Sequence, residues 1–191
     1  MRGEEVEVVG ALSLDSTLPA PLLVVLPGSH TKFVLVDSAR RIEASMTSLA
    51  GELFDVLTSH TIVAAGLERS ETIDAVWFER GLEAGAALGL GRAAFGARLL
   101  DQFAGLSGAS RASYLLGAVI AGDRDALRSS EALRIPKGTA LLVLGRAPLQ
   151  DAYARALAPV FGAPVVLETG PDLAARGALQ LARLRGLLSD D

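Results

Sequence analysis

The stretch LLVVLPGSHTKFVLVD, from Leu22 to Asp37, restricts the fold of this chain more than any other. Two apolar runs flank a short polar segment that contains a glycine, and this pattern predicts two strands joined by a loop. Because the apolar runs are continuous rather than alternating, we expect both faces of each strand to be covered. The stretch therefore predicts the centre of an α/β sheet.

The loop of this stretch concentrates polar groups, since Gly28, Ser29, His30, Thr31 and Lys32 follow one another. Glycine lets backbone N–H groups approach an anion, hydroxyl groups donate hydrogen bonds, and lysine adds a positive charge. This composition is typical of a loop that binds phosphate. An ordinary solvated turn has a similar composition, so the loop alone leaves both interpretations open.

Composition excludes several classes of function. The chain has 191 residues, which suits one domain or one domain with an appendage, and half of them are hydrophobic. There is no cysteine for a disulfide or a thiolate metal site, and the net charge of −4 gives no reason to expect nucleic acid or an anionic membrane as a partner. No apolar run reaches membrane-spanning length and no signal peptide is visible, so we expect a cytoplasmic protein.

Further elements are predicted around the strand pair. A short amphipathic helix at the N-terminus carries Val8 and Leu12 on one face, a third strand is expected at 40–45, and a helix at 47–57. Gly51 in the first turn of this last helix lowers its helix propensity. That cost indicates a close approach of the backbone to another segment, either a bound group or only a strand.

The rest of the chain divides into a helical middle and an end that contains strands. Residues 73–130 have a helical pattern rich in alanine and glycine, whereas 140–144 and 165–167 are short apolar runs that are each followed by a helical pattern. This order predicts a parallel βαβ unit with a right-handed crossover. Gly145 follows the first of these strands, at the position where open α/β sheets bind ligands.

Seven sequence blocks spread over the chain carry a resemblance to one family. They are MRGEE at 1–5, LPGSHTKF at 26–33, TSLAGELF at 47–54, LTSHTIV at 57–63, FERGL at 78–82, SYLLGAVIAG at 113–122 and LGRAPLQDAYARAL at 144–157. In this order they resemble the 2-dehydro-3-deoxygalactonokinase (2-keto-3-deoxygalactonate kinase) family of the sugar kinase and actin-like ATPase superfamily. The chain departs from the family at Ala50, where a threonine hydroxyl is usual, and at Leu116, where a serine is usual.

The resemblance implies a ribonuclease H-like (actin-like ATPase) lobe with a mixed five-stranded sheet and a helical insertion at about 73–130. Strand 22–26 is then expected to pair antiparallel with 33–37 and parallel with 140–144. The family blocks that precede MRGEE have no counterpart here. Residues 1–18 are therefore expected to be a connecting helix from a first lobe, and residues 19–191 the C-terminal nucleotide-binding lobe.

The resemblance also implies an activity, which is the ATP-dependent phosphorylation of 2-dehydro-3-deoxy-D-galactonate to its 6-phosphate in galactonate catabolism, with ATP and Mg²⁺ as cofactors. The implied cofactor-binding residues are Gly28, Ser29, His30, Thr31 and Lys32 in a phosphate loop, Gly51 beside the nucleotide, and Gly145, Arg146 and Ala147 at the adenosine. Glu4 and Glu5 are expected near the sugar or the metal. No catalytic residue is assigned, because the family's base lies before the position of Met1.

Two alternatives follow from the same comparison. The chain is expected to be weakly active or inactive alone, so a non-catalytic nucleotide-binding remnant and an actin-like module both stay open. The face of Val8 and Leu12 would pack on a first lobe, and here we expect it to be exposed or covered by a second copy in a homodimer.

Overall fold

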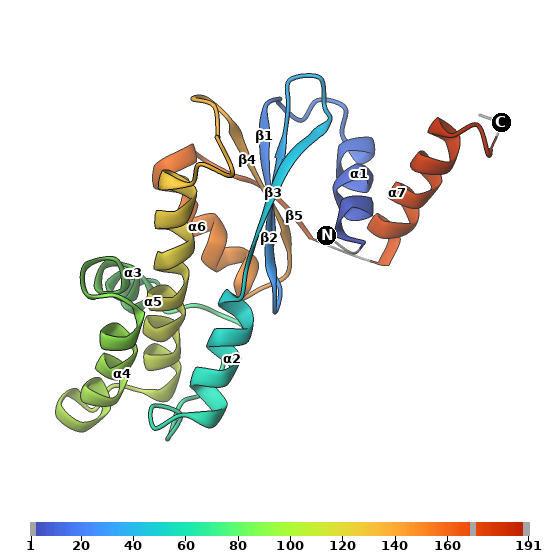
Figure 1. Cartoon of the computed structure of the whole chain (residues 1–191). Coiled ribbons are helices and arrows are strands. Elements are labelled where there is room, and N and C mark those ends of the chain that lie inside the picture. Colours follow the sequence, from blue (N-terminus) through green and yellow to red (C-terminus); the bar gives the residue numbers. More distant parts are fainter. Residues whose placement is uncertain (1–2, 169–170, 189–191) are drawn as a thin grey trace.

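The structure is a computed structural model that describes residues 3–168 and 171–188, and a five-stranded mixed sheet with helices on both faces forms its centre (Figure 1). The strands are β1 (Leu22–Leu26), β2 (Thr31–Val36), β3 (Ile42–Ser48), β4 (Ala140–Gly145) and β5 (Val165–Glu168). The helices are α1 (Glu4–Leu14), α2 (Ala50–His60), α3 (Ala75–Leu88), α4 (Leu90–Ala104), α5 (Gly108–Ser129), α6 (Leu149–Phe161) and α7 (Pro171–Leu184).

The sheet has the strand order β3-β2-β1-β4-β5. Val24 of β1 lies opposite Val34 of antiparallel β2 and opposite Leu142 of parallel β4, so the pairing predicted for strand 22–26 is confirmed. All residues of β1 and β2 are buried, as their continuous apolar runs predicted. The third strand lies slightly later than predicted and ends at Ser48, whose Oγ accepts a hydrogen bond from the Ala50 N–H at 3.1 Å.

Different helices pack on the two faces of the sheet. Phe33 and Leu35 of β2 join the core formed with α3, α5 and α6, whereas Val34 and Val36 join the core formed with α1 and α7. Figure 1 shows the sheet nearly edge-on between these two groups of helices. Because side chains alternate along a strand, Thr31 shares the face of Phe33, and Lys32 shares the face of Val34.

Helix α1 packs against α7 and the sheet of its own chain. Val8 is fully buried and Leu12 packs on the same core. A Cβ on Gly10 would lie 2.1 Å from the Leu173 carbonyl oxygen, and one on Gly177 would lie 1.8 Å from a carbonyl oxygen of α1, so these glycines allow the two helices to touch. The expectation of an exposed or dimer-covered α1 face is therefore wrong, because α7 covers it.

Arg40 fastens the C-terminal end of α1 to the turn between β2 and β3. Its guanidinium donates hydrogen bonds to the carbonyl oxygens of Leu12 at 2.9 Å, Asp15 at 3.2 Å and Leu18 at 2.9 Å. The last turn of α1 has no basic side chain of its own. Arg40 thus supplies both the positive charge and the donors that a helix C-terminus favours.

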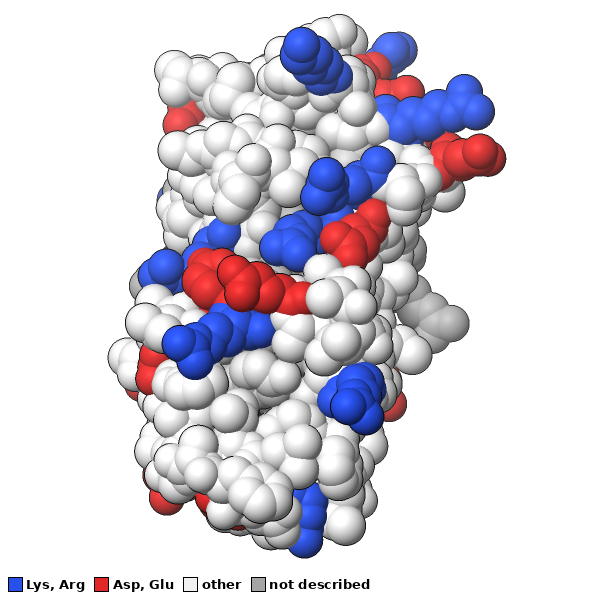
Figure 2. All heavy atoms as spheres, turned by 90° about the vertical axis from the view of Figure 1, so that its left-hand side faces the viewer, with Lys and Arg blue, Asp and Glu red and all other residues white. Residues whose placement is uncertain are grey.

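The helical segment expected near 73–130 consists of α3, α4 and α5. A Cβ on Gly81 would lie 1.9 Å from the Tyr114 carbonyl oxygen, and one on Gly117 would lie 2.1 Å from the Phe78 carbonyl oxygen, so glycine permits close packing of α3 on α5. On the face of the molecule shown in Figure 2, basic and acidic side chains lie next to one another, with uncharged areas between them. Within the described part of the chain, no helix combines the length and the apolar composition that crossing a membrane requires.

Candidate functional site

A cavity of about 500 Å³ lies at the sheet edge where β1 and β4 end. Its lining comes from five segments: Ser29 after β1; Gly51, Phe54 and Asp55 of α2; Arg69, Ser70, Glu71, Thr72 and Ile73; Ala109, Ala112, Ser113 and Leu116 of α5; and Ala147, Pro148 and Leu149 at the start of α6. The α5 side is mainly small and apolar, whereas the segment 69–72 is polar. The cavity therefore suits a ligand with a flat apolar part and polar ends.

Gly51 places the first turn of α2 against the loop that follows β1. A Cβ at this position would lie 2.0 Å from the Gly28 carbonyl oxygen and 2.9 Å from the Ser29 Cα, and real Cβ atoms do not approach backbone so closely. The Glu52 N–H also donates a hydrogen bond to the Ser29 carbonyl oxygen at 2.9 Å. The close approach that the sequence indicated is thus an approach to the loop itself.

The turn after β4 forms the opposite wall. Gly145 has a φ of +115°, which favours glycine, and a Cβ there would lie 3.4 Å from the Pro27 ring, so this turn adjoins the start of the β1–β2 loop. The Arg146 carbonyl oxygen accepts a hydrogen bond from the Gln150 N–H at 3.0 Å in the first turn of α6. Ala147 and the following residues then reach the cavity.

The side chains of His30 and Lys32 are directed away from the cavity. His30 Nε2 lies 2.8 Å from a Glu52 carboxylate oxygen, and both side chains are more than half exposed. Lys32 is buried on the α1 face, where its Nζ lies 3.2 Å from Glu4 Oε1 and donates a hydrogen bond to the His30 carbonyl oxygen at 3.2 Å. The Lys32 ammonium group therefore pairs with Glu4 on the face of the sheet opposite the cavity.

The predicted site residues thus fall into three groups. Ser29, Gly51 and Ala147 line the cavity, and Gly28, Gly145 and Arg146 lie in the same two turns without lining it. The other three loop residues contact helices: His30 contacts α2, Thr31 lies near Tyr153 of α6, and Lys32 contacts α1. Glu4 and Glu5 lie at the start of α1, where Glu4 pairs with Lys32 and Glu5 accepts a hydrogen bond from the Gly3 N–H at 3.0 Å.

Arg69 is a cavity residue that sequence reasoning missed. Its Nη2 donates to Asp55 Oδ1 at 2.6 Å and to Ser59 Oγ at 3.0 Å, and its Cζ lies 5.7 Å from the centroid of the Phe54 ring. These contacts hold the segment after α2 against that helix. A single arginine in a segment without periodicity carries no recognisable signal, so only the tertiary structure shows this role.

A buried polar cluster lies beside the cavity. The Tyr153 hydroxyl of α6 donates to Asp123 Oδ2 of α5 at 2.5 Å. The hydroxyl groups of Ser48 and Thr31 lie near Asp123 and Tyr153, respectively. Burial raises the pKa of Asp123, and the neighbouring Ser48 and Tyr153 hydroxyl groups partly oppose that rise. Burial and the nearby Asp123 charge raise the pKa of Tyr153, so its hydroxyl stays protonated and donates.

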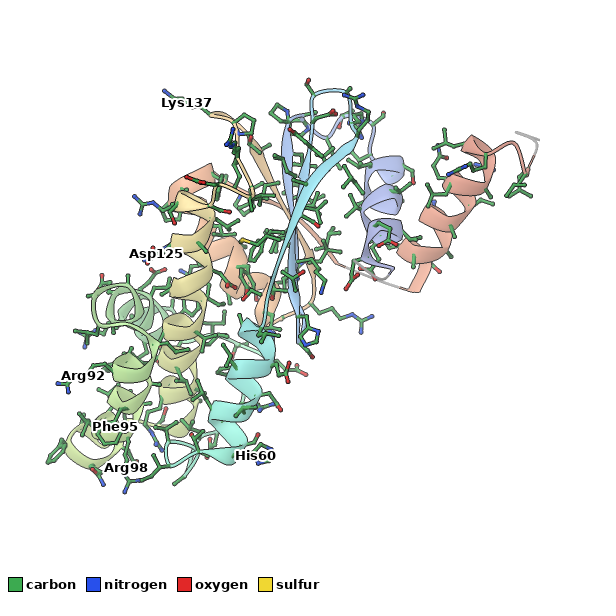
Figure 3. The ribbon with its side chains drawn as sticks, viewed as in Figure 1. His60, Arg92, Phe95, Arg98, Asp125 and Lys137 are labelled. Atoms are coloured by element: carbon green, nitrogen blue, oxygen red, sulfur yellow. The ribbon has the colours of Figure 1, made fainter. Side chains whose placement is uncertain are left out.

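The histidines and carboxylates of the described residues form no metal site. In the ranges 3–168 and 171–188, no three His, Cys, Asp or Glu side chains come together in a group that could hold a metal ion. Figure 3 shows His60 at the end of α2 that is remote from the sheet, far from the loop after β1. Mg²⁺ commonly binds through one or two carboxylates together with substrate phosphates and water, so a Mg²⁺ ion that binds with a nucleotide would not need such a group.

Comparison with known proteins identifies relatives of this chain. Residues 1–181 match the model of the family described as 2-keto-3-deoxy-galactonokinase. The 2-dehydro-3-deoxygalactonokinase of Escherichia coli (strain K12) is 32% identical over 148 residues, which are 74% of this chain and 48% of that protein. A provisionally named 2-dehydro-3-deoxygalactonokinase of Rhizobium meliloti (strain 1021) is 38% identical over 76 residues, which are 39% of this chain and 24% of that protein.

A solved structure extends the similarity to three dimensions. The crystal structure of a provisionally named 2-dehydro-3-deoxygalactonokinase from Sinorhizobium meliloti superimposes with a TM-score of 0.78 at 26% sequence identity. The match covers 98% of this chain but 61% of that one. The chain therefore spans about half the length of the Escherichia coli relative and less than two thirds of this structural neighbour.

Proposed function

Because this chain belongs to the 2-keto-3-deoxy-galactonokinase family, we propose that it supplies the nucleotide-binding part of a sugar-acid kinase. The proposed reaction transfers the γ-phosphoryl group of ATP to the 6-hydroxyl of 2-dehydro-3-deoxy-D-galactonate, in cytoplasmic galactonate catabolism. We further propose that residues 19–191 form a ribonuclease H-like lobe of the actin-like type, and that residues 1–18 connect it to a first lobe.

The convergence of three separate sequence segments on one cavity supports this proposal most strongly. Ser29 and Gly51 belong to the expected phosphate side, and Ala147 belongs to the expected adenosine side, yet all three line the same cavity. The cavity also lies at the carboxyl ends of β1 and β4, where open α/β sheets bind ligands. Its volume of about 500 Å³ lies in the range of small-molecule sites.

The charges around the cavity suggest which way a nucleotide lies. Glu71 would repel phosphate and Arg69 offsets the charge of Asp55, whereas Ser29 offers a hydroxyl donor beside the first turn of α2. We therefore place the phosphates at the Ser29 end and the base against Ala112 and Leu116 of α5. In this arrangement the chain binds and orients ATP, and Mg²⁺ bound with the nucleotide would offset phosphate charge.

Calorimetry with a variant that fills the cavity tests nucleotide binding. We expect the wild-type chain to bind ADP, and Ala109→Phe to weaken ADP binding by at least about tenfold, because a phenyl group would occupy space that the base needs. Ala126→Phe is the matched control, because Ala126 lies on the same helix at a half-buried position outside the cavity lining. Equal ADP affinity in both variants, or no binding by the wild type, would contradict the proposal.

A further inference from the structure

The buried cluster of Thr31, Ser48, Asp123 and Tyr153 connects every wall of the cavity except the segment 69–73. Thr31 follows cavity residue Ser29 by two positions, and Ser48 ends the strand that leads directly into α2. Asp123 lies two helical turns beyond the cavity residue Leu116 on α5, and Tyr153 lies one turn beyond Leu149 on α6. Residues at these helical spacings share a face, so the cluster and the cavity occupy the same side of both helices.

We propose that Asp123 and Tyr153 are positioning residues that set the distance between the loop after β1, the start of α2, and helices α5 and α6. This inference rests on the proposed function for the identity of the ligand, an adenine nucleotide. The two side chains do not line the cavity. They act through the hydroxyl groups of Ser48 and Thr31, which lie beside Asp123 and Tyr153, respectively.

Helix α2 has limited apolar contact with the core. Ala50 is its one buried residue, Phe54 and Leu57 are partly buried against the core, and Leu53 and Val56 are exposed. The contacts of its first turn, where Ser48 and Gly51 meet the rest of the molecule, therefore add to a small area of apolar packing. A polar contact between Ser48 and the carboxylate of Asp123 is directional, whereas aliphatic packing is not.

The burial of a carboxylate in this place also calls for an explanation. Asp123 is 7% exposed and Tyr153 is 1% exposed, and the surrounding core is otherwise aliphatic and aromatic. A buried carboxylate is costly unless it is well hydrogen-bonded, and well-packed apolar residues are often at least as stable. Stability alone therefore does not explain why Asp123 and Tyr153 are buried together. Their neighbours Thr31 and Ser48 lie close in sequence to cavity residues, and this suggests a role in shaping the cavity.

Tyr153→Phe separates positioning from packing. The variant loses the hydroxyl but keeps the ring, whose centroid lies 5.8 Å from that of Phe33 in an edge-on arrangement. We expect a folded protein whose dissociation constant for ADP rises on the order of fivefold, a change typical of one lost hydrogen bond. Asp123→Asn keeps the shape and an acceptor oxygen for Tyr153, so we expect it to retain ADP affinity within about twofold.

The matched control destabilises the other face of the sheet. Val34→Ala removes buried methyl groups in the core that faces α1 and α7, so it lowers the unfolding midpoint without touching the cluster. Calorimetry at a temperature where all variants are folded then compares ADP binding. If Val34→Ala weakens ADP binding as much as Tyr153→Phe does, or if Tyr153→Phe binds ADP like the wild type, the inference is overturned.

Hydrogen exchange supplies a readout that needs no ligand. We expect the Tyr153→Phe protein to exchange faster in peptides that cover 27–33 and 48–54, because the Glu52 N–H bond to the Ser29 carbonyl oxygen joins these two segments. Peptides of α1 and α7 should keep wild-type rates. A wild-type chain that fails to bind ADP would contradict the proposed function, while unchanged exchange in both peptides would contradict the positioning role.

Discussion

Gly51→Ala is expected to lower the free energy of unfolding by about 1–3 kcal/mol, the range typical of overpacked sites, and to remove most ADP binding. The added Cβ would lie 2.0 Å from the Gly28 carbonyl oxygen, and the neighbouring atoms are backbone rather than a flexible side chain. The loop after β1 must then move, and Ser29 moves with it away from the cavity wall. Alanine's better helix propensity, worth about 1 kcal/mol, opposes the loss but does not offset it. Chemical denaturation and calorimetry with ADP measure the two effects.

Gly91→Ala provides the control for this prediction. Gly91 also lies in a helix, α4, but a Cβ there would meet no atom within 4 Å. This variant should be as stable as the wild type or more stable by up to about 1 kcal/mol, with unchanged ADP affinity. If Gly51→Ala behaves like Gly91→Ala, the contact between α2 and the loop is not needed for the cavity.

The purified 191-residue chain is expected to show kinase turnover far below about 1 s⁻¹, the lower end of the usual range for kinases. Phosphoryl transfer depends on several groups that act together to position ATP, the acceptor hydroxyl and a base, and the loss of part of such a set lowers the rate by orders of magnitude. The chain corresponds to 48% of the Escherichia coli relative. A coupled assay with ATP, Mg²⁺ and 2-dehydro-3-deoxygalactonate measures the turnover.

The whole Escherichia coli relative serves as the positive control in the same assay. If the relative turns over and the 191-residue chain does so at a comparable rate, the chain contains more of the catalytic machinery than we assign to it. If the chain binds ADP in calorimetry but does not turn over, it acts as a nucleotide-binding part. These two measurements together separate a kinase from a non-catalytic nucleotide-binding remnant.

The central strands follow from the sequence alone, for a local reason. The apolar runs on either side of the Gly28 loop can be buried only if both faces are covered, which requires a central place in a sheet. Gly51 likewise signals a close backbone contact, because glycine is otherwise unfavourable in a helix. Seven blocks in a fixed order indicated the family, and the match over residues 1–181 confirms it.

Only the tertiary structure decided which residues share a site. Alternation along β2 places Lys32 and Thr31 on opposite faces, but only the course of α1 gives Lys32 its partner Glu4, and only the course of α2 and α6 puts the cavity on the other face. The same holds for Val8, which α7 covers, and for Tyr153 and Asp123, which meet across two helices. Periodicity reports which face of an element is apolar. The partner of that face is set by contacts between residues far apart in the sequence, which local patterns do not encode.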